Sequence, residues 1–141
     1  MMNIKYKKYY GVCDDAKKIR DEVFVKEQGF KDEFDEIDRY AATLVFYDED
    51  TPIGVCRYFK DKSVGEYHIG RVAVIKSYRG MGVGAVIMKT AENEIKADGG
   101  NVSLISAQLQ AKGFYEKIDY TSYGDTYFEE HCEHIRMRKC L

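Results

Sequence analysis

The spacing of apolar residues near the start of the chain predicts a strand followed by a helix. Residues 3–9 are charged and aromatic, which is typical of a short edge strand. Ile19 and Val23 then fall on one face of a helical repeat, and Asp14 or Asp15 stands where a capping residue is preferred. We therefore expect an edge strand and an amphipathic helix.

Three apolar, β-prone stretches follow the helix. They span residues 41–47, 53–60 and 66–75. Residues 48–52 and 61–65 separate them and are rich in the Asp, Gly, Ser and Pro that form turns. Strands joined by short turns predict an antiparallel meander.

After residue 80 the apolar period becomes helical. The apolar positions are Ile87, Met88, Ala91 and Ile95, and the positions expected on the polar face are Lys89, Glu92, Asn93 and Lys96. A strand at 102–106, a helix at 111–118 and further strands follow. Strands on both sides of a strand–loop–helix–strand unit predict an α/β fold of the mixed α+β type.

Composition narrows the class of protein. The 141 residues predict one domain, residues 1–141, and 22 basic against 24 acidic residues give no electrostatic footprint for nucleic acid. No apolar run reaches the ~18 residues of a membrane span, and the first nine residues lack the apolar core of a secretory signal. The sequence predicts a cytoplasmic protein whose four cysteines, in no C-x-x-C pair, are free thiols, several of them buried.

An acidic run occupies residues 32–38. It contains Asp32, Glu33, Asp35, Glu36 and Asp38. Such a run forms a solvated face, or a rim that attracts a cationic substrate through its long-range field. Both interpretations stay open.

A glycine-rich loop at residues 79–84 joins the third meander strand to the long helix. Glycine permits positive φ and close approach of a ligand to the backbone. Free N–H groups and the dipole at a helix N-terminus bind anions, pyrophosphate above all, and Arg79 can add a charged contact. The loop therefore predicts an anion site.

Two nucleotide-binding loops fit this segment poorly. A P-loop requires Gly-Lys-Ser/Thr, and Met88 stands where that glycine belongs. The dinucleotide fingerprint is met weakly by Gly80, Gly82 and Ala85, but the next strand ends at Gln108 without the acidic residue that would bind a ribose. A nucleotide-dependent oxidoreductase remains a distant alternative.

Residues 79–84 instead resemble the R/Q-x-x-G-x-G/A loop of the GNAT superfamily of acyl-CoA-dependent N-acyltransferases. Residues 71–74 resemble that family's central strand, and 108–120 its downstream motif N-x-x-A-x-x-x-Y-x-x-x-G-F. Residues 20–28 and 128–137 are similar to the small bacterial ElaA-like branch. The resemblance covers nearly the whole chain and implies the GNAT fold, a central mixed, mostly antiparallel sheet flanked by helices.

The chain departs from the family pattern at three places. Gln108 replaces the usual Asn, and Asp119 with Tyr120 replaces Gly-Phe. Asp tolerates a left-handed backbone better than most residues, so the second change is compatible with the fold. Gly70 stands before Arg71 where many relatives carry Glu, which removes one catalytic carboxylate.

The resemblance implies that a primary amine of a small molecule or peptide attacks acetyl-CoA directly in a ternary complex. Tyr115 would protonate the departing thiolate, and the amide of Val74 or a neighbour would meet the thioester. The residues implied in binding the acyl donor are Val72, Ala73, Val74, Arg79, Gly80, Met81, Gly82, Val83, Gly84, Gln108 and Tyr115.

The sequence does not single out one residue as the general base that deprotonates the amine. His68 lies on the central strand, on the face of Gly70 and Val72 if pairing is regular, and histidine titrates in the required range. An ordinary half-buried strand histidine is the structural alternative, and Glu27, Glu66 and a water chain are rival bases.

Other features leave the wider role open. His131, Cys132 and His134 lack a second ligand arm at zinc spacing, so no metal is expected. The alternative function is a catalytically silent CoA-binding or regulatory module, which Gly70 favours and Tyr115 opposes. We expect acetyl-CoA and an unidentified amine as partners, without nucleic acid or membrane; the oligomeric state, a homodimer included, stays open.

Overall fold

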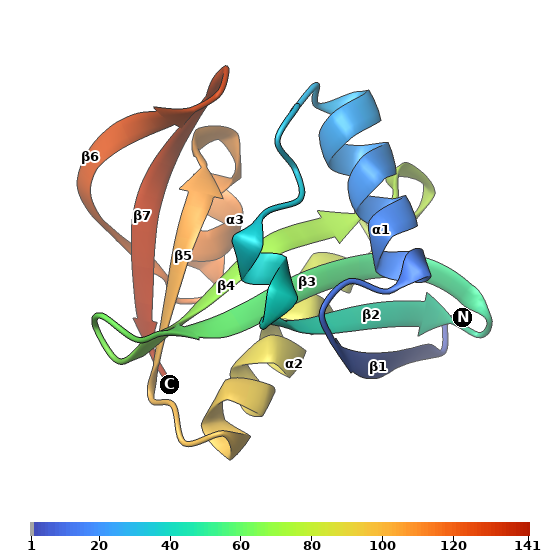
Figure 1. Cartoon of the computed structure of the whole chain (residues 1–141), viewed down its shortest axis with the longest axis horizontal. Helices are drawn as coiled ribbons and strands as arrows, with labels where there is room; N and C mark the ends of the chain where they lie inside the picture. Colours follow the sequence, from blue (N-terminus) through green and yellow to red (C-terminus); the bar gives the residue numbers. More distant parts are fainter. Residues whose placement is uncertain (1) are drawn as a thin grey trace.

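The computed structural model describes residues 2–141, and seven strands within it form one sheet in the order β1-β2-β3-β4-β5-β7-β6 (Figure 1). The strands are β1 (Ile4–Tyr10), β2 (Ala42–Asp48), β3 (Thr51–Asp61), β4 (Glu66–Val74), β5 (Val102–Gln108), β6 (Thr121–Glu129) and β7 (Cys132–Cys140). β4 and β5 pair in parallel, and the other neighbours pair antiparallel. The predicted mixed sheet, its meander and its edge strand β1 are confirmed.

Helices cover the two faces of this sheet. They are α1 (Asp14–Arg20), which continues into the π-helical η1 (Asp21–Glu27), α2 (Val83–Ala97) and α3 (Lys112–Lys117), with short 3-10 turns at η2 (Glu36–Arg39), η3 (Lys76–Tyr78) and η4 (Leu109–Ala111). Successive residues of β2 point to opposite faces of the sheet: Leu44 packs in the core under α2, and Val45 packs in the core under α1. Among the described residues, no helix is long and apolar enough to cross a membrane.

The start of α1 differs from the prediction. Cys13, with an extended backbone, is the N-cap residue, and no side chain caps the helix. Asp14 and Asp15 lie one and two positions later, inside the first turn, where their charges still complement the helix dipole. The predicted cap by either aspartate is therefore wrong.

Glu92 on α2 also differs from the prediction, since it is 3% exposed rather than on a solvated face. Its carboxylate accepts hydrogen bonds from Lys139 Nζ at 2.9 Å and from the Tyr120 hydroxyl at 3.0 Å. Ser103 hydrogen-bonds the same tyrosine at 2.7 Å. Lys139 of β7 and Tyr120, just before β6, thus satisfy a charge that the helical pattern alone assigns to solvent.

Asp119 follows α3 with φ of 78°, the left-handed conformation that glycine adopts in the family motif. The expectation that an aspartate can replace that glycine is confirmed. The four cysteines are free thiols, as expected, although Cys56 alone is fully buried.

Candidate functional site

The sheet opens between β4 and β5. These parallel strands pair at only three positions, the last being Ile69 with Ile105, and the ends that follow diverge. Residues after this point on either strand have no partner across the opening, so the facing backbone edges of the two strands are free. The split is the natural place for a ligand.

A bulge in β4 lies at the mouth of the split. Arg71 has φ of 53°, and the register of β3 sets Cys56 opposite both Arg71 and Val72. The extra residue reverses the alternation of side chains, so that Ile69 and Val72 both pack in the core under α2. The regular pairing that would put His68 and Val72 on one face does not occur.

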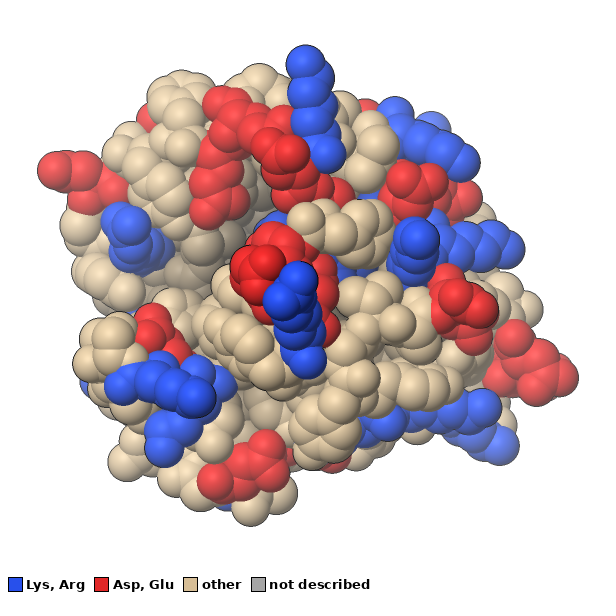
Figure 2. Space-filling model, in the orientation of Figure 1, with Lys and Arg blue, Asp and Glu red and all other residues tan. Residues whose placement is uncertain are grey.

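A cavity of about 520 Å³ occupies this region, and Figure 2 shows the face hollowed with acidic side chains around the hollow. β4 contributes His68, Ile69, Gly70, Arg71 and Val72; β5 and α3 contribute Ile105, Ser106, Gln108 and Tyr115; β6 and β7 contribute Glu129 and His134. Among the described residues, the buried side-chain nitrogens without a hydrogen-bond partner are Arg57 Nε and His68 Nε2, and both residues line this cavity. Unpartnered buried polar atoms indicate a place for polar groups of a ligand.

One side of the cavity is an ion network. Its members are Arg20, Arg57 and Arg71 with Glu33, Asp35 and Asp38. Arg20 Nη1 lies 2.7 Å from Asp38 Oδ1, and Arg71 Nε lies 2.9 Å from Glu33 Oε2. Glu33 and Asp38 are 4% and 9% exposed, so the prediction of a solvated acidic face is wrong for both.

Burial and the arginines act in opposite directions on these carboxyls. Burial outweighs the neighbouring guanidinium groups at Glu33 and raises its pKa. At Asp38 burial is the largest single effect, but the hydrogen bonds from Arg20 and its neighbours together exceed it and lower the pKa to about 2. The acidic run therefore fastens the segment 32–38 to α1, β3 and β4.

The turn between β6 and β7 is docked onto the loop that follows η1. The Glu130 carboxylate accepts hydrogen bonds from the backbone N–H groups of Lys31, at 2.9 Å, and Asp32, at 3.0 Å. The rings of Phe30 and His131 lie 5.1 Å apart. Through these contacts the β6–β7 turn and the loop after η1, which are far apart in the sequence, cover the cavity. We call these two segments the roof.

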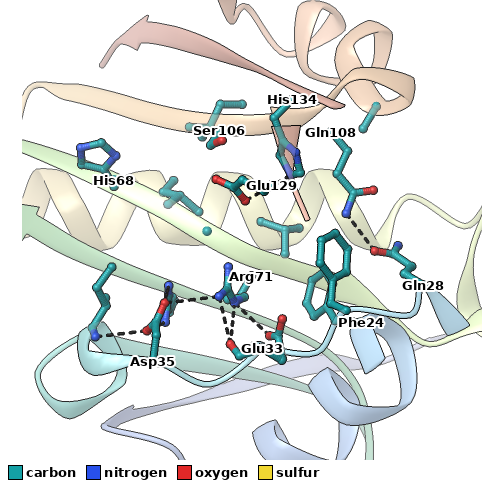
Figure 3. Close-up of a pocket in the computed structure, with 18 of the residues that line it drawn as sticks. Phe24, Gln28, Glu33, Asp35, His68, Arg71, Ser106, Gln108, Glu129 and His134 are labelled. Carbon is teal, nitrogen blue, oxygen red and sulfur yellow. Dashed lines mark hydrogen bonds and ion pairs between the residues drawn. The ribbon is translucent and has the colours of Figure 1, made fainter. Parts of the chain in front are cut away.

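Gln108, a predicted donor-binding residue, closes one end of the cavity. Its Nε2 donates a hydrogen bond to Gln28 Oε1 at 2.8 Å (Figure 3). Gln110 Nε2 donates to Gln108 Oε1 at 2.7 Å. The bridge joins the end of η1 to the end of β5 across the split.

Tyr115 projects from α3 into the same cavity. Its ring makes edge contacts with Phe114 and Tyr120, at centroid distances of 5.0 and 5.9 Å. Burial raises the pKa of Tyr115 well above its usual value. The hydroxyl therefore stays protonated at neutral pH, as a proton donor requires.

His68 lines the cavity as well, at its left end in Figure 3. Its ring stacks on Phe59 at 5.2 Å, and its Nε2 lies 3.4 Å from Asp61 Oδ2 without forming a hydrogen bond to it. Burial lowers the pKa of His68, so the neutral form is favoured.

The two rival carboxylate bases are engaged elsewhere. The hydrogen bond from Arg79 lowers the pKa of Glu27, which makes it a weaker base. Glu66 lies 3.7 Å from Arg138 Nη2 and is not part of the cavity lining. Neither carboxylate is placed to accept a proton in the cavity.

The glycine-rich loop has the predicted backbone. Gly80 and Gly82 have φ of 76° and 81°, and Gly82 is the N-cap of α2. No side chain caps this helix, and its first turn contains no acidic residue. The first N–H groups of α2 are therefore available to an anion. Val83 is buried, so its amide rather than its side chain can contribute.

Gly84 and Arg79 make contacts that the sequence did not suggest. A Cβ on Gly84 would lie 3.2 Å from Phe114 Cζ, so this glycine admits a ring of α3. Arg79 forms a two-point pair with Glu27, with N–O distances of 2.5 and 2.8 Å, and its Nε donates to the Val74 carbonyl at 2.9 Å. Its contact with a phosphate stays a prediction.

The structure thus gathers only part of the predicted set. Val72, Gln108, Tyr115 and His68 line the cavity, whereas the loop 79–84 lies outside it and Ala73 is buried under α1. Glu129 and His134 also line the cavity, although Glu129 is not among the predicted site residues and His134 is considered from sequence only as a metal ligand. The available signal was the two-residue period of β7, which directs His134 and Met137 to opposite faces.

Comparison with known proteins gives consistent results. The family model described as "Acetyltransferase (GNAT) domain" matches residues 11–141. The uncharacterized N-acetyltransferase YjcF of Bacillus subtilis is 35% identical over 128 residues, covering 89% of this chain and 90% of YjcF.

Solved structures show the same fold. The crystal structure of Escherichia coli ElaA has a TM-score of 0.84 at 23% identity, covering 97% of this chain and 99% of ElaA. An acyl-CoA N-acyltransferase from Pseudomonas aeruginosa also has a TM-score of 0.84, at 21% identity, covering 99% of this chain and 100% of that one.

Proposed function

The chain belongs to the GNAT family of acetyltransferases, and we propose that it transfers an acetyl group from acetyl-CoA to a primary amine of a small molecule or peptide. The observation that carries the proposal is the split between β4 and β5, with Tyr115 on its wall. A single domain, residues 1–141, acting in the cytoplasm would contain the whole site.

Acetyl-CoA, the acyl donor, fits against the end of β4, the loop 79–84 and the start of α2. The uncapped start of α2 and the loop 79–84 offer backbone N–H groups to the pyrophosphate, with Arg79 beside them. Val72, Ala73 and Val74 border the opening, so an amide on this strand can donate to the thioester oxygen. Gln108 closes the other side.

The residues of the cavity supply the proton transfers. The amine nitrogen forms a bond to the thioester carbonyl carbon, the C–S bond breaks, and the thiolate takes the Tyr115 proton. The acylated nitrogen then loses its excess proton, which restores the tyrosine hydroxyl. A histidine of the wall accepts the proton that frees the amine. His68 is the candidate from sequence, and His134 is the other histidine in this lining.

The test incubates the protein with acetyl-CoA and a panel of primary amines, including a cell extract, and measures CoA release and the mass gained by the acceptor. Turnover with any amine supports the proposal. CoA binding by calorimetry without release for any amine would instead establish the silent CoA-binding module, which the missing carboxylate at Gly70 favours.

A further inference from the structure

His134 has a fixed orientation in the cavity wall. It is 4% exposed, and its ring stacks on Tyr127 of β6 at a centroid distance of 5.9 Å. Nδ1 lies 2.9 Å from the Cys132 carbonyl oxygen, and Nε2 lies 3.5 Å from Glu129 Oε2. Each ring nitrogen therefore has one named polar neighbour.

These two contacts determine where the ring carries its proton. A carbonyl oxygen only accepts hydrogen bonds, so Nδ1 must be the protonated nitrogen of the neutral ring. Nε2 then presents its lone pair beside the Glu129 carboxylate, and two acceptors face each other. A cationic donor placed beside the pair, within hydrogen-bond reach of both atoms, would satisfy both, and a primary ammonium has three N–H groups to offer.

The position of the pair favours it over His68. In Figure 3 Glu129 and His134 lie across the cavity from Arg71, the residue of the β4 bulge, whereas His68 lies toward one end. His68 is also still within the paired part of β4 and β5, opposite Leu104. His134 pairs in register with Gln108, on the open part of β5.

We propose that Glu129 and His134 bind the acceptor as its ammonium ion and that His134 Nε2 takes the proton that frees the amine. This rests on the proposed function. The ammonium N–H bond breaks, its electron pair stays on nitrogen as the nucleophile, and the proton forms the Nε2–H bond. The resulting imidazolium donates to the Cys132 carbonyl and to Glu129, which stabilises the charge. The acceptor class is a basic, alkyl-type primary amine.

The charge around the pair agrees with a cationic acceptor. Glu130 of the β6–β7 turn and Asp32 of the loop facing it line the same cavity as Glu129. Tyr127 is the ring against His134, and Arg136 lies over that tyrosine, 4.3 Å from its centroid. Arg57 and Arg71 of the opposite wall also line the cavity, but Glu33 and Asp35 pair with them.

The test compares His134→Gln with wild type on two kinds of acceptor. For alkylamines, which are ammonium ions at neutral pH, kcat/KM should fall by roughly 10²-fold or more, the range of general-base catalysis. For aniline, which is already neutral, the loss should be much smaller. Glu129→Gln should raise KM for alkylamines, while Asp125→Asn, on the exposed part of β6, should not. Equal losses with both acceptors, or a selective loss in His68→Gln instead, would overturn the proposal.

A second measurement does not depend on turnover. In ¹⁵N NMR spectra of wild-type protein, neutral His134 should carry its proton on Nδ1, and the Nε2 signal should shift as alkylamines from the same panel are added. The shift should be lost in Glu129→Gln. A proton on Nε2 of the neutral ring, or no response to any amine, refutes the site. Absence of turnover with an intact NMR response would refute the proposed function alone.

Discussion

Tyr115 is the residue whose removal tests the chemical step most directly. Tyr115→Phe keeps the ring that packs against Phe114 and Tyr120 but deletes the hydroxyl proton. Because burial keeps the hydroxyl protonated, we expect kcat to fall by roughly 10²-fold with little change in CoA affinity. Steady-state kinetics and calorimetry measure the two quantities.

The loss in Tyr115→Phe should shrink for a thioester whose thiol is more acidic, since a better leaving group needs less protonation. A loss of the same size for every thiol would show that Tyr115 only positions the donor. Near-normal turnover with acyl transfer still rate-limiting would remove the acid role.

At the scale of elements, the start of α2 is the predicted pyrophosphate site. Ala85 is exposed in the first turn, so Ala85→Asp adds a charge without the backbone strain of a substitution at Gly82. The aspartate should stabilise the helix by about 0.3–1 kcal/mol through its dipole. It should nevertheless weaken CoA binding at least tenfold, or about 1.4 kcal/mol.

Ala85→Asn is the matched control, because it has the same shape without the charge, and its CoA affinity should stay near wild type. Calorimetry with pantetheine, which lacks the pyrophosphate, should give similar affinities for both variants. Equal CoA affinity of Ala85→Asp and Ala85→Asn would place the anion site elsewhere.

The segment 32–38 contributes to stability through Asp38. Its folded pKa of about 2 lies below the ordinary value of 3.8, so folding favours the carboxylate. This contribution is complete above about pH 4 and is lost as pH falls through about 2. Glu33, whose pKa is raised by burial, acts with the opposite sign, so the Asp38 effect is read as a difference between variants.

Asp38→Asn should lower the free energy of unfolding by about 3 kcal/mol at pH 7, because it leaves Arg20 and Arg57 short of a buried counter-charge. The difference from wild type should narrow between pH 4 and 2. Denaturant unfolding across this range measures it. Glu36→Gln in the same turn, where the side chain is 80% exposed, should change stability by no more than ~0.5 kcal/mol. A difference that does not depend on pH would contradict the assignment.

At the scale of the whole molecule, the roof joins the loop after η1 to the β6–β7 turn. Glu130→Ala removes the acceptor of the Lys31 and Asp32 N–H groups, which are 99 and 98 residues away. Hydrogen exchange at these two amides should accelerate, and KM for the amine should rise while CoA affinity is kept. Asp125→Ala on the same hairpin is the control. Unchanged exchange would show that other contacts hold the roof.

Elements with a regular local period were predictable from sequence. The apolar face of α2 needs only the spacing of Ile87, Ala91 and Ile95, and each meander strand needs only its own apolar run. The left-handed Asp119 was also predictable, because the backbone demand is local.

The candidate site depends on contacts that no local pattern contains. The burial of Asp38 requires Arg20, 18 residues earlier, and Glu92 requires Lys139, 47 residues later. The direction of His134 depends on the register of β7 against β5 and on the hairpin that brings Glu129 to it. A charged residue whose partner is distant in the sequence is predicted to face solvent. This explains why Asp38 and Glu92, which are buried, were expected on solvated faces.

The short pairing between β4 and β5 also has a mechanical consequence. Three residue pairs join these strands, whereas seven join β1 to β2 and seven join β5 to β7. A force applied through β1 and β7 therefore loads a line with few backbone hydrogen bonds, and the sheet should part there first. A molecule bound across the opening would hold β4 and β5 together. The rupture force in a single-molecule pulling experiment should therefore rise with the concentration of CoA.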